Sequence, residues 1–424
     1  MLGRVWHKKI DGVNPSCKVD IMDFKEIVQF LSEQNPGDIL CLGARTGDMA
    51  ETLNKLERKY PDKYNKRTIF ASIRDKDDAN GQVDPGPDSG IFTTFDSSKG
   101  LERKICVVFD FTESYWTVRS RKPNQKYEIL RNIFCVAASR GKDHIIFVHK
   151  DEELLSEDML STPTESNPVL EDMSISQMFD FKYKEDVEDC FFCLECERIE
   201  NTGDNSIIDV NTADGLIDLS PYIGIYQEQC FFKGYDLEKE LDLIYQLDQD
   251  RAKMYQREFY TGSSQKKILI LTALETHLNR YIDQVETPFV TDEETDAIKE
   301  RLSTVFSSKD EVQKGCSITF KYGHGETFDA LGLIDVFKDN TVYELKFTSA
   351  LTHEHFLQCA CYIAATDAEK GILWNTRDNA MYEIRIRDKD KFLNTVAKTI
   401  TKGEFNARWS VKKFEKKKIA KPKK

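Results

Sequence analysis

The stretch GLIDVFKDNTVYELKF, residues 332–347, consists of two apolar runs separated by the polar segment KDNT. Asp339 and Asn340 form a favourable centre for a two-residue turn, so the sequence predicts an antiparallel hairpin. Each apolar run contains a carboxylate. In a hairpin that is symmetric about the turn, Asp335 faces Glu344, so that two like charges become direct cross-strand neighbours.

Such a pair needs a partner charge. Cβ atoms of facing residues lie roughly 4.5–5.5 Å apart, and like charges at that separation destabilise a sheet. A divalent cation between the carboxylates would turn the repulsion into attraction. The strand period of two places Lys346 on the same face as Glu344. A solvent-facing hairpin with an ordinary glutamate and lysine is the alternative, and a bulge would break the pairing.

Two carboxylates and an ammonium at one strand end suit the hydrolysis of a phosphodiester. Oxygen ligands favour Mg²⁺ or Mn²⁺, which polarises the phosphate and lowers the pKa of bound water. The lysine would orient that water or stabilise the developing charge. The sequence therefore predicts a metal-dependent nuclease.

Five positions of this region resemble the RecB-like branch of the PD-(D/E)xK nucleases. They are an aspartate after GLI, a Glu-x-Lys about nine residues later and a Gln-x-x-x-Tyr helix: Asp335, Glu344, Lys346, Gln358 and Tyr362. The resemblance implies that the first three are catalytic and that the two carboxylates bind metal. It also implies that the last two, which share one helix face, contact DNA.

The same resemblance covers roughly residues 260–400 and implies a histidine metal ligand on an upstream helix. TALETHLNRY offers His277 for this role, and Glu275 is a weaker candidate. A lone histidine on a helix also fits a plain packing or surface role, so His277 depends on its position in the expected order of motifs.

Residues 37–150 alternate short apolar strands with polar helical stretches, which is typical of a doubly wound parallel α/β sheet. Within it, TTFDSSKGLERKICVVF and NIFCVAASRGKDHIIFV resemble motifs V and VI of the UvrD/Rep group of superfamily 1 helicases. GDILCLGARTGDMAETLNKL is similar to motif IV. The resemblance implies a RecA-like domain, the second of the two in such helicases.

The helicase resemblance implies five nucleotide-binding positions: Arg45, Lys99, Gly100, Glu102 and Arg140. In that family the two arginines reach the γ-phosphate of ATP, as an arginine finger does. No GxxxxGK[ST] occurs in the sequence, so the loop that cradles phosphates is missing. We therefore expect ATP binding only if a partner chain supplies the N-terminal helicase domain, and no ATPase or helicase activity from this chain alone.

Charge is distributed unevenly over the 424 residues. The net charge is −13, yet the C-terminal VKKFEKKKIAKPKK is strongly basic. That tail predicts a solvated end, or alternatively a contact with phosphates. Acidic residues dominate positions 151–250. This region includes a linker that is rich in Ser, Thr and Pro. No long apolar run or secretory leader occurs, so we expect a cytoplasmic protein without membrane contact.

Eleven cysteines without secretory context predict reduced thiols. Cys190, Cys193 and Cys196 form CxxCxxC, for which an iron–sulfur cluster is one hypothesis and a zinc site with Cys230 another. In the cluster-bearing nucleases most of the cysteines follow the Gln-x-x-x-Tyr helix, whereas here none follows Cys361. The sequence therefore favours an apolar strand with incidental cysteines over a cluster.

The predicted organisation is a RecA-like helicase C-terminal (2A-like) domain at 1–150, an acidic linker and adapter at 151–240, a PD-(D/E)xK nuclease domain at 241–410 and a basic tail at 411–424. The predicted function is a metal-dependent DNA nuclease coupled to a helicase-like domain. The alternative is a non-catalytic subunit that binds DNA or a helicase and completes a split superfamily 1 enzyme.

Overall fold

The computed structural model contains two compact units, each with its own sheet. The first comprises residues 1–168, 211–218 and 269–286, and the second comprises 169–210, 219–268 and 287–424. The structure describes residues 16–44, 47–71, 85–98, 100–112, 115, 139–150, 154–155, 172–179, 184–201, 203–212, 217–247, 249–276, 278–279, 281–322, 326–401 and 408–411.

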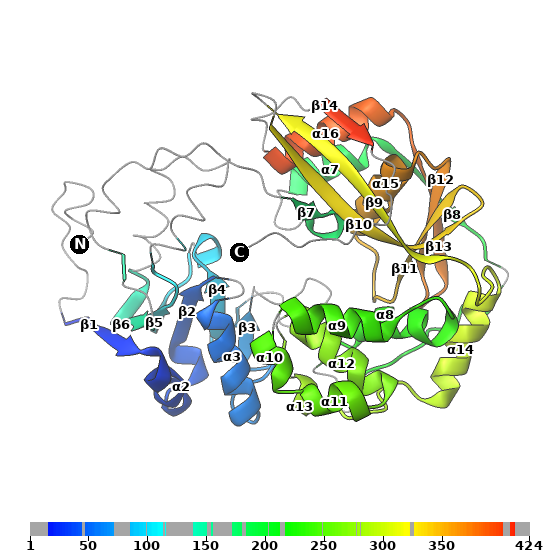
Figure 1. The fold of residues 1–424 in the computed structure, drawn as a ribbon. Coiled ribbons are helices and arrows are strands. Elements are labelled where there is room, and N and C mark those ends of the chain that lie inside the picture. The colour runs from blue at the N-terminus through cyan, green and yellow to red at the C-terminus, as the bar shows by residue number, and fades with distance from the viewer. Residues whose placement is uncertain are drawn as a thin grey trace. The chain divides into compact units, whose positions relative to one another are not determined.

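A six-stranded parallel sheet forms the centre of the first unit (Figure 1), in the order β1-β6-β5-β2-β4-β3. The parallel α/β sheet predicted from the alternating pattern is thus confirmed. The strands are β1 (Lys18–Asp23), β2 (Ile39–Gly43), β3 (Ile69–Ala71), β4 (Gly90–Thr94), β5 (Arg103–Val108) and β6 (Gly141–His149).

Both faces of this sheet are buried, which explains why its strands are continuous apolar runs. Along β2, Ile39 and Cys41 pack into one core with helices α2 (Phe24–Glu33) and α3 (Asp48–Lys59). Leu40 and Leu42 pack into a second core on the opposite face. Two short 3₁₀ turns, η1 (Pro36–Asp38) and η2 (Asp96–Ser98), precede β2 and β5.

A segment distant in sequence completes the first unit. The short helix α13 (Tyr281–Gln284) contacts α3 through Gln284, whose Nε2 donates to the carbonyl of Glu57 at 2.8 Å. Asp283 pairs with Arg58 at 2.7 Å. The chain therefore returns to the first unit after it has already contributed to the second.

The sheet of the second unit has eight strands and mixed direction, in the order β14-β9-β10-β11-β12-β13-β8, with β7 paired to β10 off this path. β11 and β12 are parallel, whereas β10 is antiparallel to both β9 and β11. The strands are β7 (Met173–Ser174), β8 (Leu194–Ile199), β9 (Val312–Tyr322), β10 (Glu326–Lys338), β11 (Thr341–Lys346), β12 (Lys370–Asn375), β13 (Ala380–Ile386) and β14 (Arg408–Val411).

Helix α15 (His353–Thr366) packs on this sheet against β9, β11, β12 and β13, and its residues from Phe356 to Ala365 are almost all buried. Helix α7 packs against α15, and α16 packs in turn against α7 (Figure 1). The other helical elements are η3 (Ile175–Gln177), α7 (Lys184–Phe191), α8 (Ser220–Phe231), α9 (Leu237–Leu247), α10 (Gln249–Lys253), α11 (Gln256–Thr261), α12 (Ser264–Glu275), α14 (Asp292–Ser303) and α16 (Lys389–Thr401).

The predicted hairpin is present. Phe337 pairs with Val342, as predicted, and Asp339 and Asn340 have φ of 48° and 55°, the left-handed values that a tight hairpin turn requires. The regular β10–β11 pairing reaches only as far as Val336 with Tyr343. The next positions outward are those of the two carboxylates.

Within the part of the chain that the structure describes, no helix is long and apolar enough to cross a membrane.

Candidate active site

Three elements of the second unit bring the predicted catalytic residues together. β10 carries Asp335, β11 carries Glu344 and Lys346, and α15 carries the Gln-x-x-x-Tyr pair. β11 lies between β10 and β12 in the sheet, and helix α15 packs against it. Glu344 is accordingly only 1% exposed, while Lys346 keeps 22% of its surface open.

A continuous series of polar contacts connects β11 to α15. Nζ of Lys346 lies 2.8 Å from Oε1 of Glu344 and donates to Oε1 of Gln358 at 3.1 Å. Nε2 of Gln358 in turn donates to the hydroxyl of Tyr362 at 3.1 Å. The four-residue spacing of Gln358 and Tyr362 makes this last bond possible, because residues four apart lie on one helix face.

Asp335 joins the group from the neighbouring strand. Its Oδ2 accepts a hydrogen bond from the main-chain N–H of Leu345 at 2.7 Å, where the regular ladder has ended. Burial, followed by the negative charges of Glu344 and Glu228, raises the pKa of Asp335 well above its usual value. The nearby ammonium of Lys346 opposes that shift without cancelling it.

Glu228 of α8 is a third carboxylate that the sequence analysis missed. It is 7% exposed, and its Oε2 accepts from Nε2 of Gln313 at 2.5 Å. Burial, together with the charge of Glu344, raises the pKa of Glu228 to about 8. The only signal in the sequence is an acidic residue inside the apolar stretch YIGIYQEQCFF, which lies more than 100 residues before Glu344.

The donor set of this group fits a hard cation. Asp335, Glu344 and Glu228 offer only oxygen, which Mg²⁺ and Mn²⁺ prefer. Oε2 of Glu344 is buried and has no hydrogen-bond partner, which leaves an acceptor available for a positive charge. Among the residues that the structure describes, no three His, Cys, Asp or Glu side chains already surround one point. A cation would therefore rely on one or two carboxylates plus water or phosphate oxygens, as Mg²⁺ usually does.

Some predicted site residues lie outside the described residues. These are His277, the candidate ligand on the upstream helix, and two of the nucleotide-binding positions, Arg45 and Lys99. Glu275, the weaker candidate, is the last residue of α12.

The remaining nucleotide-binding positions are in the first unit. Gly100 has φ of +82°, with no other atom near the place of a Cβ. Glu102 pairs with Lys142 at 2.7 Å, and this contact lowers the pKa of Glu102. The carbonyl of Arg140 accepts from the N–H of Arg103 at 3.4 Å, while Nε of Arg140 is buried without a partner.

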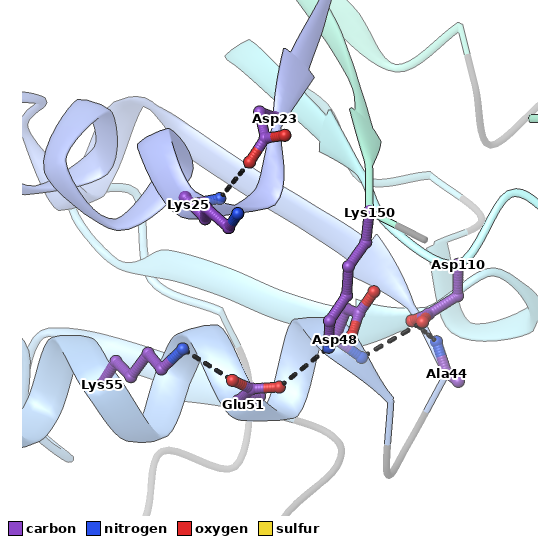
Figure 2. A network of polar contacts seen from close by, with 8 residues as sticks. All are labelled: Asp23, Lys25, Ala44, Asp48, Glu51, Lys55, Asp110 and Lys150. Carbon is purple, nitrogen blue, oxygen red and sulfur yellow. Dashed lines mark hydrogen bonds and ion pairs between the residues drawn. The ribbon is translucent and has the colours of Figure 1, made fainter. Parts of the chain in front are cut away.

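A carboxylate of the chain itself occupies the N-terminus of α3 (Figure 2). Asp110, which follows β5, accepts from the N–H of Ala44 at 2.8 Å and from that of Asp48 at 3.1 Å. Gly47 is required here, since a Cβ would lie 2.5 Å from Oδ1 of Asp110. Free N–H groups at a helix start commonly bind phosphate, but two in this region already have a carboxylate partner. Burial raises the pKa of Asp110.

The three cysteines of CxxCxxC do not share one environment. Cys190 is buried on α7, with its Sγ 3.3 Å from Oγ1 of Thr399, and Cys193 points to the carbonyl of Asp189 at 3.6 Å. Cys196 is exposed on β8. Burial raises the pKa of Cys190 to about 12, so it is not a reactive thiolate near neutral pH.

No protein-family model matches this chain, and a search of curated proteins found no match.

Proposed function

We propose that the protein is a Mg²⁺- or Mn²⁺-dependent DNA nuclease. In this proposal the second unit is a PD-(D/E)xK nuclease domain and the first is a RecA-like helicase C-terminal domain without its own phosphate loop. The observation that carries the proposal is the series of contacts from Glu344 through Lys346 and Gln358 to Tyr362, with Asp335 on the adjacent strand.

The reaction is the addition of water to a phosphodiester and the departure of one ester oxygen. A cation bound by Asp335 and Glu344 would polarise the phosphate and lower the pKa of a coordinated water. Lys346 is held by two oxygens, so its ammonium has a fixed place from which to orient the attacking water or to offset the charge that develops on the phosphate. Glu228 would add a third negative charge once the cation displaces its proton.

In this proposal the two residues of α15 have different tasks. Tyr362 is only 3% exposed and its hydroxyl accepts from Gln358, so it holds the amide in place. Gln358 is half-buried and bonds the catalytic lysine directly. We therefore assign the DNA contact of this helix chiefly to Gln358.

The test is cleavage of end-labelled single-stranded and duplex DNA with Mn²⁺. Native protein should cut at least one substrate, whereas Glu344→Gln and Lys346→Ala should lose activity with an unchanged melting temperature. Glu383→Gln is the matched control, because Glu383 lies in the same sheet but pairs with Lys370. Intact DNA with the folded native protein would contradict the proposal, and equal cutting by all variants would indicate another site or a contaminant.

A second candidate function is a non-catalytic subunit that binds DNA or completes a split superfamily 1 helicase. The missing phosphate loop and the occupation of the α3 N-terminus by Asp110 favour it. It predicts no metal-dependent cleavage under any condition. It also predicts that ATP hydrolysis by a separate chain carrying the N-terminal helicase domain increases when this protein is added.

A further inference from the structure

Two buried polar residues connect helix α8 to the strand that bears the catalytic lysine. Gln227 is fully buried and directly precedes Glu228 on α8. Thr376 is 1% exposed and directly follows β12. Neither residue contributes a charge or a metal ligand, so the proposed chemistry does not itself require them.

Thr376 forms hydrogen bonds with both Lys346 and Gln227. Its N–H donates to the carbonyl of Lys346 at 2.7 Å. Its hydroxyl lies 3.0 Å from that same carbonyl and 2.5 Å from Oε1 of Gln227. Thr376 therefore connects the main chain at Lys346 to the side chain of Gln227, the residue before Glu228.

The adjacent residue fixes the next part of the same loop. Asn375 accepts from the N–H of Thr348 at 3.0 Å and donates to its carbonyl at 2.9 Å. The chain is therefore held at Lys346 and again two residues later, where it leaves β11 for α15. Main-chain displacement of the lysine would require these buried bonds to break.

Gln227 is an unfavourable choice for packing alone. Its Nε2 is buried and has no hydrogen-bond partner, which destabilises the folded state. A methionine would occupy a similar volume without a buried unpaired amide. The presence of a glutamine therefore calls for a role other than stability.

We propose that Gln227 and Thr376 are positioning residues, which hold the main chain of Lys346 in a fixed place relative to Glu228 so that the ammonium meets the metal-bound phosphate correctly. This inference rests on the proposed nuclease function. It predicts that activity falls while stability stays nearly unchanged, because replacing two bonded polar partners by apolar groups of similar shape is nearly neutral for folding.

The experiment compares four variants with native protein: Thr376→Val, Gln227→Met, their double variant and Thr376→Ser. Thr399→Val is the control, because Thr399 is equally buried in the same unit but bonds Cys190. For each, kcat and KM of DNA cleavage with Mn²⁺ are measured beside the melting temperature. A misplacement of about 1 Å lowers rates by up to about 100-fold.

We expect kcat of the double variant to fall about 10- to 100-fold with KM and melting temperature unchanged. Thr376→Ser, which keeps the hydroxyl, should have native kcat. The control Thr399→Val should have native kcat as well. Native kcat in the double variant, beside an inactive Glu344→Gln, would overturn the positioning role and leave the nuclease standing. A loss of kcat that follows the loss of melting temperature would overturn it too. If native protein and Thr399→Val both leave DNA intact, the nuclease assignment fails and this role with it.

Discussion

Oε1 of Glu344 lies 2.8 Å from Nζ of Lys346, whereas Oε2 of the same carboxylate is buried without a partner. One half of this carboxylate is therefore neutralised by the protein and the other half is not. Asp335 and Glu228 beside it have raised pKa values, and once both lose their protons the group carries three negative charges against the one positive charge of Lys346. An added cation is the simplest way to balance it.

The contacts along α15 predict graded effects on catalysis. Removal of the ammonium in Lys346→Ala should reduce kcat most, Gln358→Leu less, and Tyr362→Phe least, since each step is one hydrogen bond further from the phosphate. Tyr362→Phe should also cost about 1 kcal/mol of unfolding free energy, because Gln358 loses a buried acceptor. Steady-state DNA cleavage and urea unfolding measure the two quantities. Tyr382→Phe, on β13, is the control, and a reversed order would refute the series.

The buried carboxylates predict an unusual dependence of stability on pH. The folded state raises the pKa of Glu228 from 4.5 to about 8, and it raises that of Asp335 as well. The folded protein therefore retains protons that the unfolded chain releases. The contribution of these protonated carboxyl groups to the free energy of unfolding is complete below about pH 4 and is lost as pH rises through about 8. Each retained proton corresponds to about 1.4 kcal/mol of unfolding free energy per pH unit.

Melting curves of metal-free protein between about pH 5 and 8 would measure this slope. Glu228→Gln should flatten it. Mn²⁺ should raise the melting temperature more at the higher pH, because the carboxylates must lose protons to bind the cation. A Mn²⁺ effect that is equal at both ends of the range, or unchanged in Glu228→Gln, would contradict a cation held by this group.

A glycine on β10 permits the close approach of Tyr362. A Cβ at Gly332 would overlap Cε1 of Tyr362 and lie 3.2 Å from Cδ1 of Ile175. We therefore expect Gly332→Ala to destabilise the second unit by about 1–3 kcal/mol and to reduce cleavage by displacing the tyrosine. Gly224→Ala is the matched control: it lies in α8 with no heavy atom within 4 Å of the new Cβ. It should stabilise by about 0.5–1 kcal/mol. Urea unfolding distinguishes the two signs.

Replacement by alanine should destabilise the protein to different extents at two aspartates of the first unit, Asp23 and Asp110 (Figure 2). Asp23 is an exposed N-cap that accepts one bond, from the N–H of Lys25 at 2.8 Å, so Asp23→Ala should cost about 1 kcal/mol. Asp110 is partly buried, accepts two main-chain bonds and has φ of 54°, which alanine tolerates poorly. Asp110→Ala should cost about 2–3 kcal/mol. Equal shifts in thermal unfolding would contradict this reading of the α3 N-terminus.

Local chemistry accounts for what the sequence predicted well. Asp339 and Asn340 set the turn, and the period of two along the flanking strands then placed Phe337 opposite Val342. The parallel sheet of the first unit was predictable for a related reason, because strands buried on both faces are continuous apolar runs. In both cases the signal lies within a few consecutive residues.

The parts that were missed depend on contacts between distant segments. Glu228 approaches Asp335 only because α8 packs in the second unit, and nothing local separates it from an ordinary helical glutamate. The apolar strand predicted to carry the three cysteines was only partly right, because Cys190 lies on helix α7 and only Cys196 lies on a strand, β8, which has four exposed residues in a row. Its pairing with β13 is set by the partner strand and not by its own pattern.

The order in which the chain contributes to the two units determines which fragments of the gene could encode a whole unit. The first unit needs residues 269–286, and the second needs α8, which comes before them. A gene cut after residue 168 would encode a first unit without the segment that contacts Glu57 and Arg58. A gene that began at residue 241 would encode the second unit without Glu228. A single crossover therefore cannot separate the two units without removing a segment that one of them uses.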